Sequence, residues 1–189
     1  MAFLSSEGTL TATASVGYPN GPNWTHQWIK TSLYLGRLRQ VYKADPVNNI
    51  DLMAVVDAFM ICCAHMWDAF KNDPGLPSIT QAEVEAAMTG DANLSLCRDY
   101  ANTAKHLKRR HSTDIQAWVL EAGSRGAGNF VTIGYGPATG PRGQTVDALE
   151  LANAGYAAWQ DFMEAHSIEE PTTVTANLLD PPTAGDGQR

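Results

Sequence analysis

The sequence predicts a mainly α protein: a four-helix bundle with a small β-hairpin inserted between the third and fourth long helices. Apolar residues recur at three- and four-residue steps over long stretches, and Pro and Gly cluster where these stretches end. One further run, rich in Val, Ile and aromatic residues, surrounds a glycine-rich turn. The chain has 189 residues, which is enough for one domain with its own hydrophobic core.

The two ends of the chain differ from its middle. Residues 1–22 are rich in Ser, Thr, Gly and Pro and contain the turn-forming run Tyr18–Pro19–Asn20–Gly21–Pro22, and residues 169–189 have the same character. We therefore expect a flexible N-terminal arm over 1–22, a helical domain over 23–168 and a flexible C-terminal tail over 169–189.

The first helix is expected from Trp24 to Tyr42, where Asp45–Pro46 stops it. The second begins after the capping residues Asn48–Asn49 and runs to about Lys71. This second helix is apolar almost all round, which predicts burial on most sides. Its few charged residues are expensive in lipid, so we interpret it as the central helix of the bundle and not as a membrane span.

A short helix is expected after Thr80, because Thr80 and Glu83 have the spacing of a capping box, and it ends at Gly90. The third long helix then runs from Asp91 to about Arg110.

The predicted hairpin lies near 114–136. Its strands are Ile115–Glu121 and Phe130–Tyr135, on either side of the turn Gly123–Gly128. A loop over 136–143 follows, and the fourth long helix runs from about Val146 to 166 with Thr145 as its cap.

Charge and cysteine content limit the classes of function. Thirteen basic against 20 acidic residues give a net charge of −7, which argues against a general nucleic-acid coat or a membrane-surface protein. Three cysteines, an odd number in helical positions, favour a reducing compartment, and no signal peptide is recognisable. We expect a cytoplasmic protein of a bacterial host cell, or one of a phage particle, without membrane contact.

Three polar residues, Asp57, His65 and Asp68, interrupt the apolar second helix. In helical projection Asp57 and Asp68 lie about 20° apart and His65 lies within about 60° of Asp68, so the three form one stripe. A buried carboxylate is costly unless it is paired, so this stripe must meet a basic or donor-rich partner or face a cleft.

The third long helix offers such a partner. Arg98, Asn102 and Lys105 share one of its faces, with Asp99 and His106 beside them. If this edge faces the stripe, Arg98 and Lys105 neutralise Asp57 and Asp68. Three interpretations stay open: a buried polar network that fixes helix packing, a solvated face, or a cleft that binds a ligand or catalyses a reaction.

Other candidate sites have simpler explanations. The basic run from Lys105 to His111 fits either RNA or nucleotide phosphate, or a solvated last helical turn. The residues His65, Asp68, His106 and His111 lack a compact metal-binding signature, and the glycines around Tyr135 do not match a phosphate-binding loop. We expect neither a metal nor a cofactor.

Several segments resemble a group of small uncharacterised bacterial and phage proteins, over about residues 50–165. They are His65–Asp68, the segment Leu96–Leu107 and the segment Asp147–Ala152 with Trp159 and Phe162. That group looks like the wider HEPN class, whose members are four-helix bundles that often dimerise and include metal-independent ribonucleases of toxin and defence systems.

In those enzymes an Arg, four to six further residues and a His supply the catalytic pair. The resemblance implies that Arg98 clamps phosphate, His106 is the general base and Asp68 orients it, with Asn102, Lys105, His65 and Asp99 around the substrate. Seven residues separate Arg98 from His106, one more than that motif has. The alternative is a non-catalytic interaction or assembly protein, of phage origin and virion-associated, whose arms dock on partner subunits.

Overall fold

A computed structural model describes residues 3–4, 10–11, 24–44, 48–76, 78–105, 115–126, 128–137 and 143–171. The helices in these ranges are α1 (Trp24–Val41), α2 (Asn49–Asn72), α3 (Gln81–Gly90), α4 (Ala92–Lys105) and α5 (Ala148–Ala165). The strands are β1 (Phe3–Leu4), β2 (Leu10–Thr11), β3 (Ile115–Arg125), β4 (Gly128–Pro137) and β5 (Gln144–Asp147). The prediction of a mainly helical protein with a small antiparallel sheet is confirmed.

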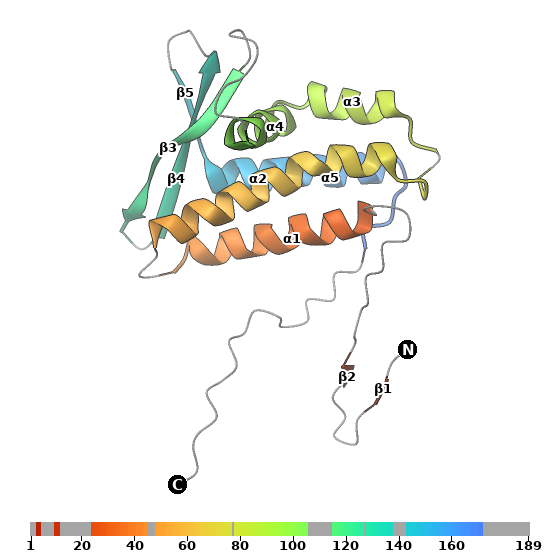
Figure 1. The fold of residues 1–189 in the computed structure, drawn as a ribbon, viewed down its shortest axis with the longest axis horizontal. Coiled ribbons are helices and arrows are strands. Elements are labelled where there is room, and N and C mark those ends of the chain that lie inside the picture. The colour runs from red at the N-terminus through yellow and green to blue at the C-terminus, as the bar shows by residue number, and fades with distance from the viewer. Residues whose placement is uncertain are drawn as a thin grey trace.

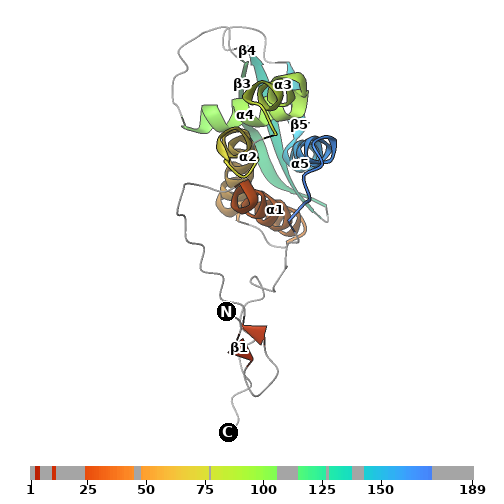
Figure 2. The same ribbon diagram turned by 90° about the vertical axis from the view of Figure 1, so that its right-hand side faces the viewer.

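The long helices α1, α2, α4 and α5 pack together, and α3 lies beside α4 (Figure 1). The sheet of β3, β4 and β5 covers the end of the bundle where α1 stops and α2 and α5 start (Figures 1 and 2). The separate pair β1 and β2 is antiparallel, with Phe3 opposite Thr11.

Helices α2 and α3 begin where their capping residues predict. The Asn48 side chain accepts a hydrogen bond from the Ile50 amide at 2.9 Å, and Thr80 forms the expected reciprocal capping box with Glu83. Asp73 accepts bonds from the Trp24 amide at 2.8 Å and the Gly75 amide at 2.7 Å, so one carboxylate closes the turn after α2 and satisfies the start of α1.

One predicted cap is wrong. Thr145 lies inside β5, and Asp147 caps α5 by accepting bonds from the amides of Leu149 and Glu150. The Asp147 carboxylate is placed by the end of the strand that precedes the helix, a position that Thr145 does not occupy.

The predicted hairpin is present, with longer strands than expected. β3 and β4 pair as far as Arg125 opposite Gly128, so most of the glycine-rich run is strand and the turn falls at Gly126, whose φ of +63° favours glycine. The sequence did not predict β5, which adds a third strand by pairing Thr132 with Asp147.

The end of α1 is tied to β4 by one amide side chain. Buried Asn129 donates from Nδ2 to the carbonyl oxygens of Val41 and Ala44, both at 2.7 Å, and its backbone amide donates to the Tyr42 carbonyl at 2.9 Å. The Tyr42 hydroxyl lies at the same junction. It accepts from the backbone amides of Val131 and Leu149 and donates to the Asp147 carboxylate at 3.2 Å.

The core is centred on aromatic side chains. The Phe70 ring contacts Trp159 and Phe162 at centroid distances of 5.4 and 5.2 Å, and the Trp159 indole donates to the buried Cys63 carbonyl at 3.0 Å. The three cysteines are free thiols, and Cys63 and Cys97 are fully buried, as core packing requires.

The first residues of the predicted tail pack on the bundle. Glu170 accepts hydrogen bonds from the Trp28 indole at 3.2 Å and from the Tyr156 hydroxyl at 3.1 Å. Burial raises the pKa of Tyr156 to about 12. The predicted arm, apart from β1 and β2, and the tail after residue 171 lie outside the described residues.

One described helix, α2, is long and apolar enough to cross a membrane, a measure that the core helix of a soluble protein also meets. Its inner side chains, including Leu52, Phe59 and Phe70, are buried in the bundle core. A protein that folds in water is compatible with this packing.

Replacing Asn129 with Ala is expected to lower the free energy of unfolding by about 2–4 kcal/mol, because two carbonyl oxygens at the junction lose their donor. Urea unfolding measures the loss. The matched control is Ser124→Ala, which removes one hydrogen bond to the same amide from an exposed residue and should cost less than about 1 kcal/mol. Equal losses for the two variants would contradict the role given to Asn129.

A methyl group at Gly155 is expected to destabilise the protein by about 1–2 kcal/mol, although Ala is the better helix former. The added Cβ would lie 3.1 Å from the Cys97 sulfur and 3.3 Å from the Cys63 sulfur, where three helices meet. If this crowding is the cause, Cys97→Ala should recover about 1 kcal/mol in the double variant relative to additive behaviour. Additive unfolding free energies would rule the crowding out.

Candidate functional site

The polar edge of α4 starts from its cap. Asp91 accepts from the amides of Asn93 and Leu94, both at 2.8 Å, which fixes the first turn of the helix. Arg98 and Asp99 then follow on the second turn, Asn102 is half-buried one turn later, and Lys105 is the last residue of α4.

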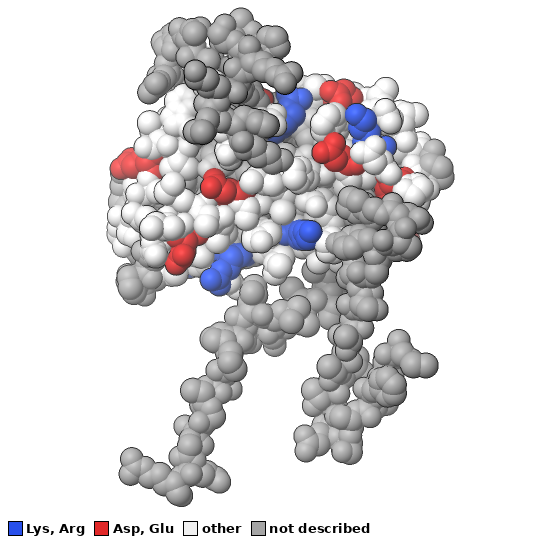
Figure 3. Space-filling view, viewed as in Figure 1, with Lys and Arg blue, Asp and Glu red and all other residues white. Residues whose placement is uncertain are grey.

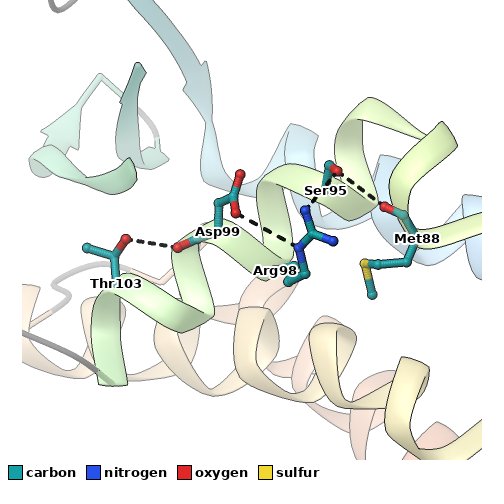
Figure 4. Close-up of polar contacts among 5 residues, drawn as sticks. All are labelled: Met88, Ser95, Arg98, Asp99 and Thr103. Carbon is teal, nitrogen blue, oxygen red and sulfur yellow. Dashed lines mark hydrogen bonds and ion pairs between the residues drawn. The ribbon is translucent and has the colours of Figure 1, made fainter. Parts of the chain in front are cut away.

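Arg98 interacts along its own helix. Its side chain is 30% exposed, with Nε 3.9 Å from the Asp99 carboxylate and Nη2 3.5 Å from the Ser95 hydroxyl (Figure 4). Ser95 in turn donates to the Met88 carbonyl of α3 at 3.2 Å, and Thr103 donates to the Asp99 carbonyl at 2.9 Å. Both contacts are long for a guanidinium. The Asp99 carboxylate therefore lowers the affinity of Arg98 for an anion, but it leaves N–H groups of the guanidinium able to donate to one.

The partner of Asp57 on α4 is a hydrogen-bond donor, one of the two kinds of partner that the sequence predicts for this stripe. The Oδ1 of Asp57 accepts a 2.6 Å hydrogen bond from the hydroxyl of Tyr100, which is 3% exposed. Tyr100 lies on the side of α4 that packs against α2. A phenol buries its ring and still presents a donor, so it satisfies the half-buried carboxylate without a cation.

This hydrogen bond also changes the acidity of the phenol. Burial first, and then the bond to Asp57 and its negative charge, raise the pKa of Tyr100 well above its ordinary value. A group with so high a pKa remains a hydrogen-bond donor across the physiological range, which suits a structural role.

The rest of the predicted stripe faces outward. Asp68 is exposed, and among the described residues it forms no ion pair with Arg98. His65, one turn before it, is half-buried. Within the described part of the chain, the hydrogen bond from Tyr100 links Asp57 of this stripe to α4.

Two predicted basic elements cannot be placed. His106 and the run Lys108–His111 lie outside the described residues, as does the side chain of Lys105. The proposed pair of Arg98 and His106 therefore stays a prediction. In the ranges that are described, no three His, Cys, Asp or Glu side chains group as metal ligands.

A cavity of about 390 Å³ lies at one end of the sheet. Its lining comes from the ends of three strands: Ile115, Tyr135, Gly136, Pro137, Gly143 and Gln144. Tyr135 carries the one ionisable side chain in this lining, so the described residues here offer shape and hydrogen bonds but no acid–base pair.

The sequence analysis missed an apolar surface on α2. We call it the outer α2 face, and it consists of Ile50, Met53, Ala54, Ala58 and Ile61. Ile50 is 74% exposed and Met53 39%, and Leu33 of the neighbouring α1 is 45% exposed. Figure 3 shows that the molecular surface over α1 and α2 is mostly uncharged, with isolated charges. The sequence does show apolar residues on nearly all sides of this helix, but we interpreted that pattern as burial within the bundle.

Comparisons with family models, with curated proteins and with solved structures find no match to this chain. The resemblance to the HEPN class therefore rests on the quoted sequence segments alone.

In Tyr100→Phe, the free energy of unfolding is expected to fall less steeply with rising pH than it does in the wild type. The folded state keeps the Tyr100 proton above pH 10 whereas the unfolded chain loses it, so the free energy of unfolding falls as pH rises, by up to about 1.4 kcal/mol per pH unit. Urea unfolding between pH 8 and about 11.5 measures the slope. Asp57→Asn is the control that keeps an acceptor and removes the charge, and it should flatten the slope in part. An unchanged slope in the Phe variant would refute this assignment.

Proposed function

We propose that this chain is a non-catalytic interaction protein that holds a protein partner on its outer α2 face. The observation that carries the proposal is the exposure of large apolar side chains there, led by Ile50 at 74%. Exposed apolar area costs about 25 cal/mol per Å² in water, and contiguous apolar patches on soluble proteins mark interaction sites.

The polar residues give weaker support to catalysis. Asp57 is satisfied by Tyr100, Arg98 lies next to Asp99, and Asp68 is exposed on the outer side of α2. A catalytic centre needs a nucleophile, base or clamp converging on one open position. The described polar groups are better explained as helix-packing and surface contacts.

Metal-independent RNA cleavage, or binding of RNA or nucleotide phosphate, is the competing proposal. One observation favours it: the Arg98 guanidinium is partly exposed beside half-buried Asn102. Purified wild type, Arg98→Ala and His106→Ala should be compared for cleavage of varied RNAs without added metal, after circular dichroism has established that all are folded. We expect no cleavage by any of them, and cleavage that both substitutions abolish would establish the competing function.

Under this proposal the protein folds in water and resides in the cytoplasm or in a phage particle. Among the described residues, the inner side of α2 packs on α1, α4 and α5, so its outer face is the side that can meet another molecule. A partner protein covers such a face with side chains of similar polarity.

A photo-crosslinking amino acid at exposed Ala54 is expected to capture a protein in the cells that express this chain. Leu120 is the matched control position, because it is 56% exposed on β3, away from the outer α2 face. Mass spectrometry identifies the captured protein. Adducts at Ala54 and not at Leu120 are the expected result, and the absence of adducts at Ala54 would overturn the proposal.

A further inference from the structure

We propose that a surface formed by α1 and α5 is a docking site for an acidic segment of a partner protein, and that the chain's own Glu170 occupies this site in the free protein. We call it the α1–α5 carboxylate site, and its donors are Trp28, Tyr156 and Gln160. The site shares no residue with the outer α2 face, so this inference goes beyond the proposed function and does not rest on it.

The site is built around a buried donor. Trp28 is 0% exposed, and its indole N–H donates to Oε1 of Glu170 at 3.2 Å. The Tyr156 hydroxyl donates to the same oxygen at 3.1 Å, and the Gln160 amide donates to Oε2 at 3.1 Å. Three side chains from two helices therefore converge on one carboxylate, whose two acceptor oxygens satisfy all three donors at once.

The donors are held in place by contacts within α1 and α5. The Trp28 and Tyr156 rings stack with their centroids 4.4 Å apart. The Ser32 hydroxyl lies 2.8 Å from the Tyr156 hydroxyl and donates to the Trp28 carbonyl at 3.0 Å. Since none of these contacts involves Glu170, the site is preformed, and a preformed site binds a ligand without the cost of ordering its own side chains.

An empty site is unfavourable. Removal of Glu170 takes away the acceptor of a fully buried indole N–H, and a buried donor without a partner costs free energy. Burial raises the pKa of Tyr156 to about 12, so its hydroxyl also remains a donor at neutral pH. The site therefore favours a second carboxylate over no occupant.

The chain's own carboxylate is held in a way that permits exchange. Glu170 is exposed, and in the part of the chain that the structure describes it forms no ion pair with a Lys, Arg or His. Residues 167–170, which we call the latch, belong to neither a helix nor a strand. The turn that directs the latch towards α1 is strained, because Ser167 has a φ of +54°, a conformation that favours glycine.

The latch also shows what the partner segment has to contain. Ile168 packs against the bundle core, and its amide donates to the Met163 carbonyl at 2.8 Å. Glu169 is exposed, and none of the three donors of the site bonds to it. The occupant is therefore an apolar residue followed two positions later by an acid. A partner segment with this pattern competes with Glu170, because both need the same indole N–H of Trp28.

The indole N–H resonance of Trp28 in ¹H–¹⁵N NMR spectra of the full chain reports on occupancy of the site. Glu170→Ala and Glu170→Gln should both shift this resonance, since each removes the carboxylate that it donates to. Glu169→Ala is the matched control and should leave it in place, and the indoles of the other tryptophans are internal references. A Trp28 resonance that responds to neither Glu170 variant, or as strongly to Glu169→Ala, would contradict the site.

A synthetic peptide of residues 167–173 tests the exchange. The double variant Ile168→Ala/Glu170→Ala, shown to be folded by circular dichroism, vacates the site. The peptide should then move the Trp28 resonance to its wild-type position. The wild type should need at least about tenfold more peptide, because a closed latch leaves only a fraction of the molecules competent to bind.

Two control ligands distinguish a protein segment from any other carboxylate. The same peptide with Gln at the position of Glu170 should bind the double variant at least about tenfold more weakly, because it lacks the charge. Acetate at the same concentration should leave the resonance unchanged, because it lacks the apolar residue. Equal titration of the wild type and the double variant, no response of the double variant, or equal effects of the peptide and either control ligand would overturn the inference.

Discussion

The junction between Asn129 and the end of α1 sets the arrangement of the other elements. A helix ends with carbonyl groups that have no partner within the helix, and burial of such groups without a donor is costly. Here a strand supplies the donors: the Asn129 amide group and backbone bond to the carbonyls of Val41, Ala44 and Tyr42. The sheet is therefore fixed to the end of the bundle by the hydrogen-bonding needs of α1 as well as by apolar packing.

From this junction the position of α5 follows. The Tyr42 hydroxyl contacts the amide of Leu149 and the carboxylate of Asp147, the residue that caps α5. With its first turn held there, α5 runs back along the bundle, and Gly155 allows it to approach the sulfurs of Cys63 and Cys97 closely. The inner side of α2 is consequently filled by α1, α4 and α5, and within the described part of the chain Ile50 and Met53 on its outer side are exposed.

The parts of the fold that sequence reasoning predicted correctly are those with local causes. The caps at Asn48 and Thr80 depend on residues within one turn, and they were identified from spacing alone. β5 was missed because four residues acquire strand structure only by pairing with β4, a contact that no local pattern encodes. The partner of Asp57 was missed for a related reason: a helical projection sorts the residues of one helix, but it does not say which arc meets the neighbour. His106 lies outside the described residues, so the catalytic hypothesis rests on sequence alone.

All-round apolarity of a helix has two physical solutions, burial inside its own domain or burial against another chain. The composition of α2 does not distinguish them, because Ile50 and Phe59 both add to its hydrophobicity although one is 74% exposed and the other is buried. The polar residues distinguish the two solutions better. In a helix surrounded by its own domain, each acid would need an internal partner; Asp57 has one on α4, whereas Asp68 is exposed. Polar residues interspersed with apolar ones on an outward face are what a specific interface requires, since the apolar area supplies affinity and the charges fix orientation.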